Sequence, residues 1–172
     1  MDEDTRLMLL VREGSERAFR QLFQKHAPRI AAYAWRFFRN RAQAEEAAQE
    51  VFLRLWRARS SYQPKAAFTT WLYTIASRVC LKEARRNRPT PPEELVPEAT
   101  PGPEEKLAGN DRLAKVQAAL EKLPTQQRAA LHLVRVEGLS YQEAAAALGL
   151  SLPAVKSAIF RATQALRRLE EE

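Results

Sequence analysis

The chain has 172 residues, 45% of them hydrophobic, so it can bury a core in one medium-sized domain or two small ones. Its net charge of +7 and pI of about 9.9 favour an anionic partner, either nucleic acid or an acidic membrane surface. A basic soluble protein without such a partner would have the same composition. The single cysteine, Cys80, excludes an intrachain disulfide, and the two histidines lie too far apart to suggest a zinc site.

The sequence indicates no membrane insertion. No run of 18 apolar residues is present, and the first residues, MDEDTRL, are acidic where a signal peptide would be basic. We therefore expect a cytoplasmic protein, and we expect it to need neither a metal nor another cofactor.

The prolines predict where the chain divides. Six of the ten prolines fall in the stretch PTPPEELVPEATPGP, and proline cannot continue a helix. We expect a linker over 89–110 between helical domains at 1–88 and 111–172. Basic residues outnumber acidic ones by 18 to 9 in the first domain and by 9 to 7 in the second, whereas the linker has 1 against 5. The positive charge is therefore concentrated in the first domain.

Helical periodicity and few glycines predict an all-α fold. In the first domain we expect a short helix that Gly14 ends, and then a long helix that Ser15 caps and Pro28 interrupts. Further helices are expected over 42–58 and 67–86, with the loop SSYQPKAA between them. The second domain should contain four helices, over 111–122, 126–136, 141–148 and 152–169.

The last two of these helices form a helix-turn-helix pattern. Ser140 and Glu143 make a capping box, Gly149 suits the left-handed residue that ends a helix, and Ser151 can cap the next helix. The second helix of such a pair enters the DNA major groove. Val155 and Ile159 should pack inward. An ordinary pair of antiparallel helices would share these signals, so the DNA-binding interpretation rests on the outward residues Ser151, Lys156, Ser157 and Arg161.

Two segments resemble a known family. Residues 123–167, LPTQQRAALHLVRVEGLSYQEAAAALGLSLPAVKSAIFRATQALR, resemble region 4 of bacterial extracytoplasmic-function (group 4) sigma factors of the sigma-70 family. Residues 44–56, AEEAAQEVFLRLW, and 68–86, FTTWLYTIASRVCLKEARR, resemble region 2 of the same group. The resemblance implies a non-catalytic subunit of RNA polymerase that contacts the β′ clamp helices and the β flap of the core enzyme. Region 2 would bind and help to melt the −10 element, and region 4 would bind the −35 element.

The resemblance also assigns roles to two helices. Glu46, Gln49, Glu50 and Leu53 share one outward face of the 42–58 helix. The resemblance assigns this face to the β′ clamp helices, and the first three of these residues match the family's contact positions. A solvated helix face is the alternative. Along the 67–86 helix a basic stripe would follow the phosphates of the −10 DNA, and we expect it to contain Arg78, Lys82, Arg85 and Arg86.

The preceding loop supplies candidates for capturing an unpaired −10 base. Aromatic rings beside cations are typical of single-strand sites, where bases stack or enter a pocket. Phe68 and Trp71 are more consistent with core positions, since they lie on the inward stripe of their helix. We therefore expect the captured base to contact Tyr62, Gln63 and Lys65.

The chain departs from the family pattern at four positions. Arg78 and Lys82 stand where the family usually has asparagine and aspartate, which adds positive charge and removes the usual −10 base contacts. Ala154 and Ala158 stand where the family often has threonine and arginine. Two hydrogen-bonding side chains are lost there, so we expect an unusual −35 preference or one that depends on DNA shape.

Other functions remain open at this point. A stand-alone helix-turn-helix regulator with a helical dimerisation domain would have a similar second half, but a dimerisation surface should be more apolar than the 42–58 face. A helical adaptor that binds only protein does not explain the basic stripe, and no catalytic constellation indicates an enzyme. The family is often inhibited by an anti-sigma protein, which would be a further partner, although nothing in the sequence identifies one.

Overall fold

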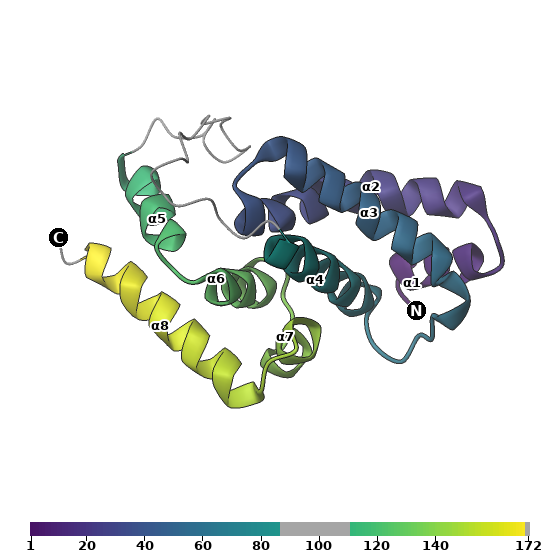
Figure 1. Ribbon diagram of the computed structural model, residues 1–172. Helices are drawn as coiled ribbons and strands as arrows, with labels where there is room; N and C mark the ends of the chain where they lie inside the picture. Colours follow the sequence, from purple (N-terminus) through teal and green to yellow (C-terminus); the bar gives the residue numbers. More distant parts are fainter. Residues whose placement is uncertain (87–110, 171–172) are drawn as a thin grey trace. The chain divides into compact units, whose positions relative to one another are not determined.

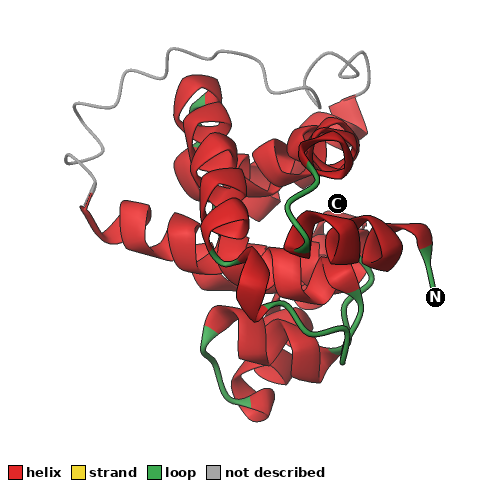
Figure 2. Cartoon of the chain, turned by 90° about the vertical axis from the view of Figure 1, so that its right-hand side faces the viewer, coloured by secondary structure: helices red, strands yellow, loops and turns green. Residues whose placement is uncertain are grey.

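We analysed a computed structural model of the protein, in which residues 1–86 and 111–170 are described (Figure 1). The chain divides into two compact units, Met1–Arg85 and Arg86–Glu172. Every regular element in the described residues is helical (Figure 2), so the predicted all-α fold is confirmed. The proline-rich linker predicted at 89–110 lies outside the described residues.

The first unit contains four α-helices, and side chains cap the starts of the first three. They are α1 (Glu3–Arg12), α2 (Glu16–Phe38), α3 (Arg41–Arg57) and α4 (Phe68–Arg86), with a short 3-10 turn, η1 (Arg59–Ser61), after α3. Side chains of Asp2, Ser15 and Asn40 accept hydrogen bonds from backbone N–H groups at the starts of α1, α2 and α3, as the predicted cap at Ser15 requires. The predicted interruption at Pro28 is absent, because α2 continues through it.

Two kinds of packing hold this unit together. Helices α2 and α3 lie side by side in close contact (Figure 1). Helix α4 instead joins α2 through large side chains: the rings of Tyr33 and Tyr73 lie 5.4 Å apart, and the Tyr33 hydroxyl is 2.7 Å from the hydroxyl of Ser77. Cys80 is fully buried in this core, and burial raises its pKa to about 12, so its thiol stays protonated.

The second unit is a small helical domain whose core is rich in alanine. It contains α5 (Asp111–Glu121), α6 (Thr125–Leu131), α7 (Tyr141–Leu148) and α8 (Leu152–Glu170), and α8 contacts the other three. Small side chains such as those of Ala129, Ala144 and Ala162 are buried between the helices and allow their backbones to approach closely. The guanidinium group of Arg128 donates to the backbone carbonyl of Glu121 and thereby links α6 to α5.

The end of α6 differs from the single helix that we predicted over 126–136. The α-helix stops at Leu131, and residues His132–Val136 form a π-helical turn, η3. In this turn the buried side chains of His132 and Glu137 meet, with Nε2 3.3 Å from Oε1. The backbone N–H of Leu139 donates to the carbonyl of Leu133, so the wider turn directs the chain into α7.

The helix-turn-helix forms as the sequence predicts. The capping box is present, because Ser140 Oγ accepts from the N–H of Glu143 while Glu143 Oε1 accepts from the N–H of Ser140. Gly149 ends α7 with φ of +66°, a left-handed conformation that glycine adopts without a steric penalty. The chain direction then changes by 106° between α7 and α8, within the range of about 90–120° that is typical of this motif.

No single helix in the described part of the chain is long and apolar enough to cross a membrane. The bent pair formed by α7 and α8 meets that criterion only when its two helices are taken together.

Candidate nucleic-acid and protein interfaces

One face of α3 presents an apolar side chain among polar ones. Glu46, Gln49 and Leu53 are exposed and Glu50 is partly exposed, so the predicted face does point outward. Leu53 has half of its surface accessible to solvent. The face is less acidic than its sequence suggests, because Glu50 accepts a hydrogen bond of 3.1 Å from the guanidinium group of Arg54. Exposed leucine beside carboxylates is suited to a protein partner that has both apolar and basic groups.

The basic stripe of α4 is exposed as predicted. The side chains of Arg78, Lys82, Arg85 and Arg86 all face solvent. The neighbouring Val79 and Cys80 are buried, so burial fixes which side of the helix points outward. Unit 1 therefore presents a mixed acidic and apolar face on α3 and a cationic face on α4.

The loop between η1 and α4 is anchored at both ends by aromatic rings. Tyr62 is only 1% exposed, and its ring lies edge-on to Trp71 with centroids 5.0 Å apart. Phe68 is fully buried at the other end, with its ring centroid 6.4 Å from that of Tyr62. Residues 63–67 between these rings are all exposed.

Burial changes the interpretation of Tyr62. We predicted that Tyr62 contacts the captured base, but the structure places its ring in the core, where burial raises the pKa of its hydroxyl. The ring is not accessible to DNA in this conformation. Of the three predicted base contacts in the loop, Gln63 and Lys65 are on the surface.

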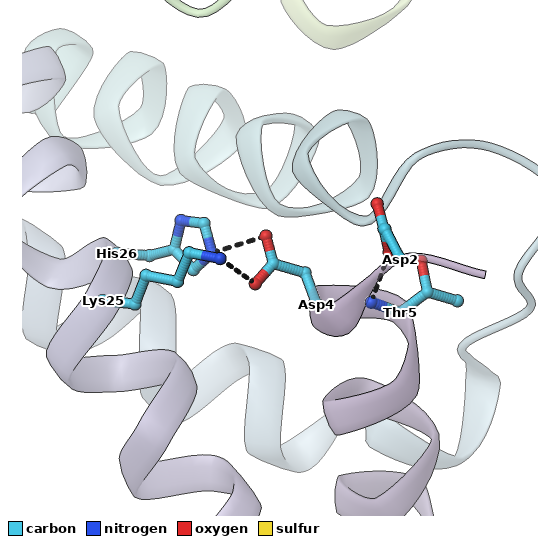
Figure 3. A network of polar contacts seen from close by, with 5 residues as sticks. All are labelled: Asp2, Asp4, Thr5, Lys25 and His26. Atoms are coloured by element: carbon cyan, nitrogen blue, oxygen red, sulfur yellow. Dashed lines mark hydrogen bonds and ion pairs between the residues drawn. The ribbon is translucent and has the colours of Figure 1, made fainter.

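Helix α1 makes a polar network with α2 that sequence analysis did not find. The carboxylate of Asp4 accepts hydrogen bonds from Lys25 Nζ at 2.9 Å and from His26 Nε2 at 3.1 Å (Figure 3). His26 is 1% exposed, and its ring centroid lies 5.5 Å from that of Phe68. Burial lowers the pKa of His26, and the hydrogen bond to Asp4 only partly opposes this effect. The separate hydrogen bond from Lys25 to Asp4 raises the pKa of Lys25.

The C-terminal end of α1 contacts the loop directly. Arg12 Nη1 donates to the backbone carbonyl of Tyr62 over 3.2 Å, although the two residues are 50 positions apart in the sequence. The guanidinium group of Arg59 in η1 stacks on the ring of Trp56 at 4.1 Å and donates to the Trp56 carbonyl. The start of the loop is therefore fixed by two arginines from different helical segments.

The outward face of α8 contains one residue that our sequence analysis missed. Val155 and Ile159 are buried as predicted, and Lys156, Ser157 and Arg161 are exposed. Phe160 is also exposed, at 63%, and lies four residues after Lys156 on the same side of the helix. That spacing was the signal in the sequence that could have identified it.

Two further positions of this helix-turn-helix have structural roles. Ser151 Oγ accepts from the N–H of Ala154 at 3.2 Å, so this predicted DNA contact also caps α8. Ala158, one of the two positions of α8 that depart from the family pattern, is only 5% exposed and packs against the neighbouring helices. Ala154, the other position in this helix that departs from the family pattern, is partly accessible to solvent.

Comparison with protein families identifies the chain. The Sigma-70 region 2 model matches residues 22–90, and the Sigma-70 region 4 model matches residues 113–166. The chain belongs to the sigma-70 family. The two matches cover most of each unit, whereas α1 lies before the first of them.

Relatives place this sigma factor in the extracytoplasmic-function group. It is 39% identical to the ECF RNA polymerase sigma factor SigE of Mycolicibacterium smegmatis over 86% of this chain, and spans 59% of that relative's length. It is 32% identical to the ECF sigma factor RpoE of Cereibacter sphaeroides, over 94% of this chain and 92% of the relative. It is 33% identical to the sigma factor CnrH of Cupriavidus metallidurans, over 98% and 94% of the two chains.

Two solved structures have a similar fold. CnrH in complex with the cytosolic domain of CnrY is 30% identical, with a TM-score of 0.72 over 99% of this chain and 98% of that one. The sigma factor RpoE of Bartonella quintana, in complex with the anti-sigma factor NepR, is 25% identical, with a TM-score of 0.68 over 89% of this chain and 96% of that one.

The buried His26 predicts how the stability of unit 1 depends on pH. Because burial lowers its folded-state pKa below the unfolded value of about 6.5, folding favours the neutral ring. This contribution is complete above the unfolded pKa and is lost as pH falls toward the folded one. We expect the free energy of unfolding to fall between pH 7 and 5, and to fall less in a His26→Gln variant. Chemical denaturation of both proteins at each pH would measure the difference; equal slopes would contradict it.

Proposed function

We propose that the chain is an RNA polymerase sigma subunit that acts in the cytoplasm without catalytic chemistry of its own. It would bind the core enzyme, direct it to promoters and help to open the −10 element. The observation that carries this proposal is the presence, on unit 1, of two exposed faces of opposite character, together with a helix-turn-helix in unit 2. Family matches to both region 2 and region 4 support it.

The face of α3 would bind the β′ clamp helices of the core enzyme. Its exposed leucine can enter an apolar depression on the partner while Glu46 and Gln49 contact polar groups around it. Glu50 already pairs with Arg54, and exposed pairs of this kind contribute little stability, so binding can exchange that partner at low cost. Contact with the β flap would come from unit 2.

The cationic stripe of α4 would follow the phosphates of the −10 DNA while the loop 63–67 contacts an unpaired base. Extruding a base costs a few kcal/mol, which stacking, pocket contacts and phosphate neutralisation must offset. Because the Tyr62 ring is buried, we assign the base contact to Gln63 and Lys65. Gln63 has both a donor and acceptors, which permits hydrogen bonds with a base edge.

The exposed side of α8 would bind the −35 element in the major groove. Lys156 and Arg161 can neutralise phosphates or contact guanine, and Ser157 can donate to a phosphate or a base. We add Phe160, because an exposed aromatic ring on this face can contact the methyl group of thymine. This apolar contact would compensate in part for the small side chain at position 154.

An anti-sigma protein is a further proposed partner. The similar structures of CnrH and of RpoE were solved in complex with CnrY and with the anti-sigma factor NepR. An inhibitor that covered the α3 face would block polymerase binding through the same exposed Leu53 that we assign to the core enzyme. The alternative of a stand-alone regulator is not favoured, because the similarity extends over region 2 as well as the helix-turn-helix.

Run-off transcription tests the proposed function as a whole. Core polymerase from the host, incubated with genomic fragments, should give transcripts with defined start sites only when the protein is added. The matched control is core polymerase with the same protein after heat denaturation. A protein that binds duplex DNA tightly as a dimer and never selects a start site would favour the stand-alone regulator.

The α3 face is tested with a double variant, Glu46→Lys with Gln49→Ala. Both positions are exposed, so the helix content and melting temperature should not change, while affinity for core polymerase should fall by at least tenfold in a pull-down titration. Glu13→Lys with Gln24→Ala is the matched control, because it makes the same two changes at exposed positions that lie outside α3. Equal binding by wild type and the double variant would refute the assigned face.

Two substitutions on α8 separate phosphate binding from base recognition. Lys156→Ala should weaken holoenzyme binding to all −35 sequences about equally and reduce the slope of log K against log salt by about 1. Phe160→Ala should instead change the preference at a thymine while leaving the salt slope as it was. Fluorescence anisotropy at several salt concentrations measures both effects. A sequence-dependent effect of Lys156→Ala would show that Lys156 reads a base.

A further inference from the structure

Helix α1 is linked to the residues at both ends of the exposed loop 63–67, directly at one end and through α2 at the other. At the first end, Arg12 Nη1 donates directly to the carbonyl of Tyr62, the residue that precedes the loop. At the other end the contact passes through His26: Asp4 binds its Nε2, and its ring packs on Phe68, the residue that follows the loop. Figure 3 shows the Asp4 side chain pointing from α1 toward Lys25 and His26 on α2.

The residues at the two ends of the loop and the Asp4–His26 contact are buried, whereas Arg12 is exposed and its bond to Tyr62 is partly buried. Tyr62, Phe68 and His26 are each at most 1% exposed, and Asp4 has only 13% of its side-chain surface accessible. Hydrogen bonds that involve an ionised group in such surroundings are stronger than those between neutral groups in water. The exposed loop therefore begins and ends at buried residues that are linked to α1, directly at Tyr62 and through His26 at Phe68.

We propose that α1 is a positioning element for the base-binding loop, and that Arg12 and Asp4 are its positioning residues. This inference rests on the proposed function, in which residues of the loop contact an unpaired −10 base. Neither residue would touch DNA. Arg12 fixes where the loop leaves Tyr62, and Asp4, through His26, fixes where it enters α4 at Phe68.

The physical reason for such an element lies in the length of the loop. Base discrimination by Gln63 and Lys65 requires their donors and acceptors to lie within hydrogen-bond distance of one base edge. A five-residue exposed loop with no internal core samples many conformations unless its ends are fixed. Fixed ends hold these donors and acceptors in one arrangement, so a wrong base leaves some of them unpaired and binds less tightly than the correct one.

The test measures base discrimination rather than binding alone. Holoenzyme made with the wild-type chain is first used to select a binding oligonucleotide from a single-stranded pool randomised over the −10 length. Affinities are then measured for that oligonucleotide and for its three single-base changes at the most constrained position. Arg12→Ala should reduce the ratio of the affinity for the best base to the affinities for the other three by about fivefold. The affinity of the variant for core polymerase should stay within twofold of wild type.

Matched variants distinguish positioning from general damage. Arg6→Ala removes an exposed arginine of the same helix, six residues before Arg12, and should leave the ratio at the wild-type value. Arg12→Lys keeps one N–H donor for the Tyr62 carbonyl and should restore most of the ratio. Asp4→Ala should lower the ratio as Arg12→Ala does, whereas Glu3→Ala, an exposed carboxylate beside it, should not.

A second measurement uses the free chain. In Arg12→Ala, amide hydrogen exchange should become faster at residues 63 and 65–67, with the cores of α2 and α3 exchanging at the wild-type rate. An unchanged base ratio in Arg12→Ala or in Asp4→Ala would overturn the inference, and so would an equal loss of affinity for all four bases. If the wild-type holoenzyme itself showed no base preference, the proposed function of the loop would fail instead.

Discussion

The buried hydrogen bond between Tyr33 and Ser77 fixes the rotation of α4, and the cationic face of unit 1 depends on that rotation. The two hydroxyls lie 2.7 Å apart and both side chains are fully buried. Leaving one of them without its partner would cost about 1–3 kcal/mol, so a rotated α4 is strongly disfavoured. With Ser77 facing α2 and Val79 and Cys80 buried, Arg78 is on the exposed side of the helix, and Lys82 follows four residues later on the same face. The edge-to-face packing of the Tyr33 and Tyr73 rings lies beside this hydrogen bond and joins the same two helices.

Local signals in the sequence predicted the helices and the helix-turn-helix. Capping residues such as Ser15 and Ser140, and the left-handed Gly149, act within three or four residues of themselves, so their effect does not depend on the tertiary fold. The exposed faces of α3 and α4 were predictable for a related reason. A helix with a continuous apolar stripe buries that stripe, and the residues opposite it must face solvent.

The features that the sequence could not predict are determined by contacts between residues far apart in the chain. The Tyr62 ring turns inward because Phe68 and Trp71 provide a buried partner, and a loop sequence gives no sign of that choice. Arg12 reaches Tyr62 across 50 residues, and Asp4 reaches His26 across 22. The π-helical turn at His132–Val136 was missed because its apolar spacing differs from that of an α-helix by only one residue.

The departures from the family pattern act in one direction. Arg78 and Lys82 place positive charge on an exposed face where the family usually has asparagine and aspartate, while Ala154 removes a hydrogen-bonding group from α8. Positive charge strengthens binding to every sequence, and fewer donors at base edges weaken discrimination between them. In a sigma factor built this way, promoter choice would depend on few side chains, chiefly Gln63 in the loop and Ser157 and Phe160 on α8. The two on α8 are held by a helix with a packed core behind it. Gln63 has no such support of its own, so its accuracy depends on how rigidly α1 holds the ends of the loop.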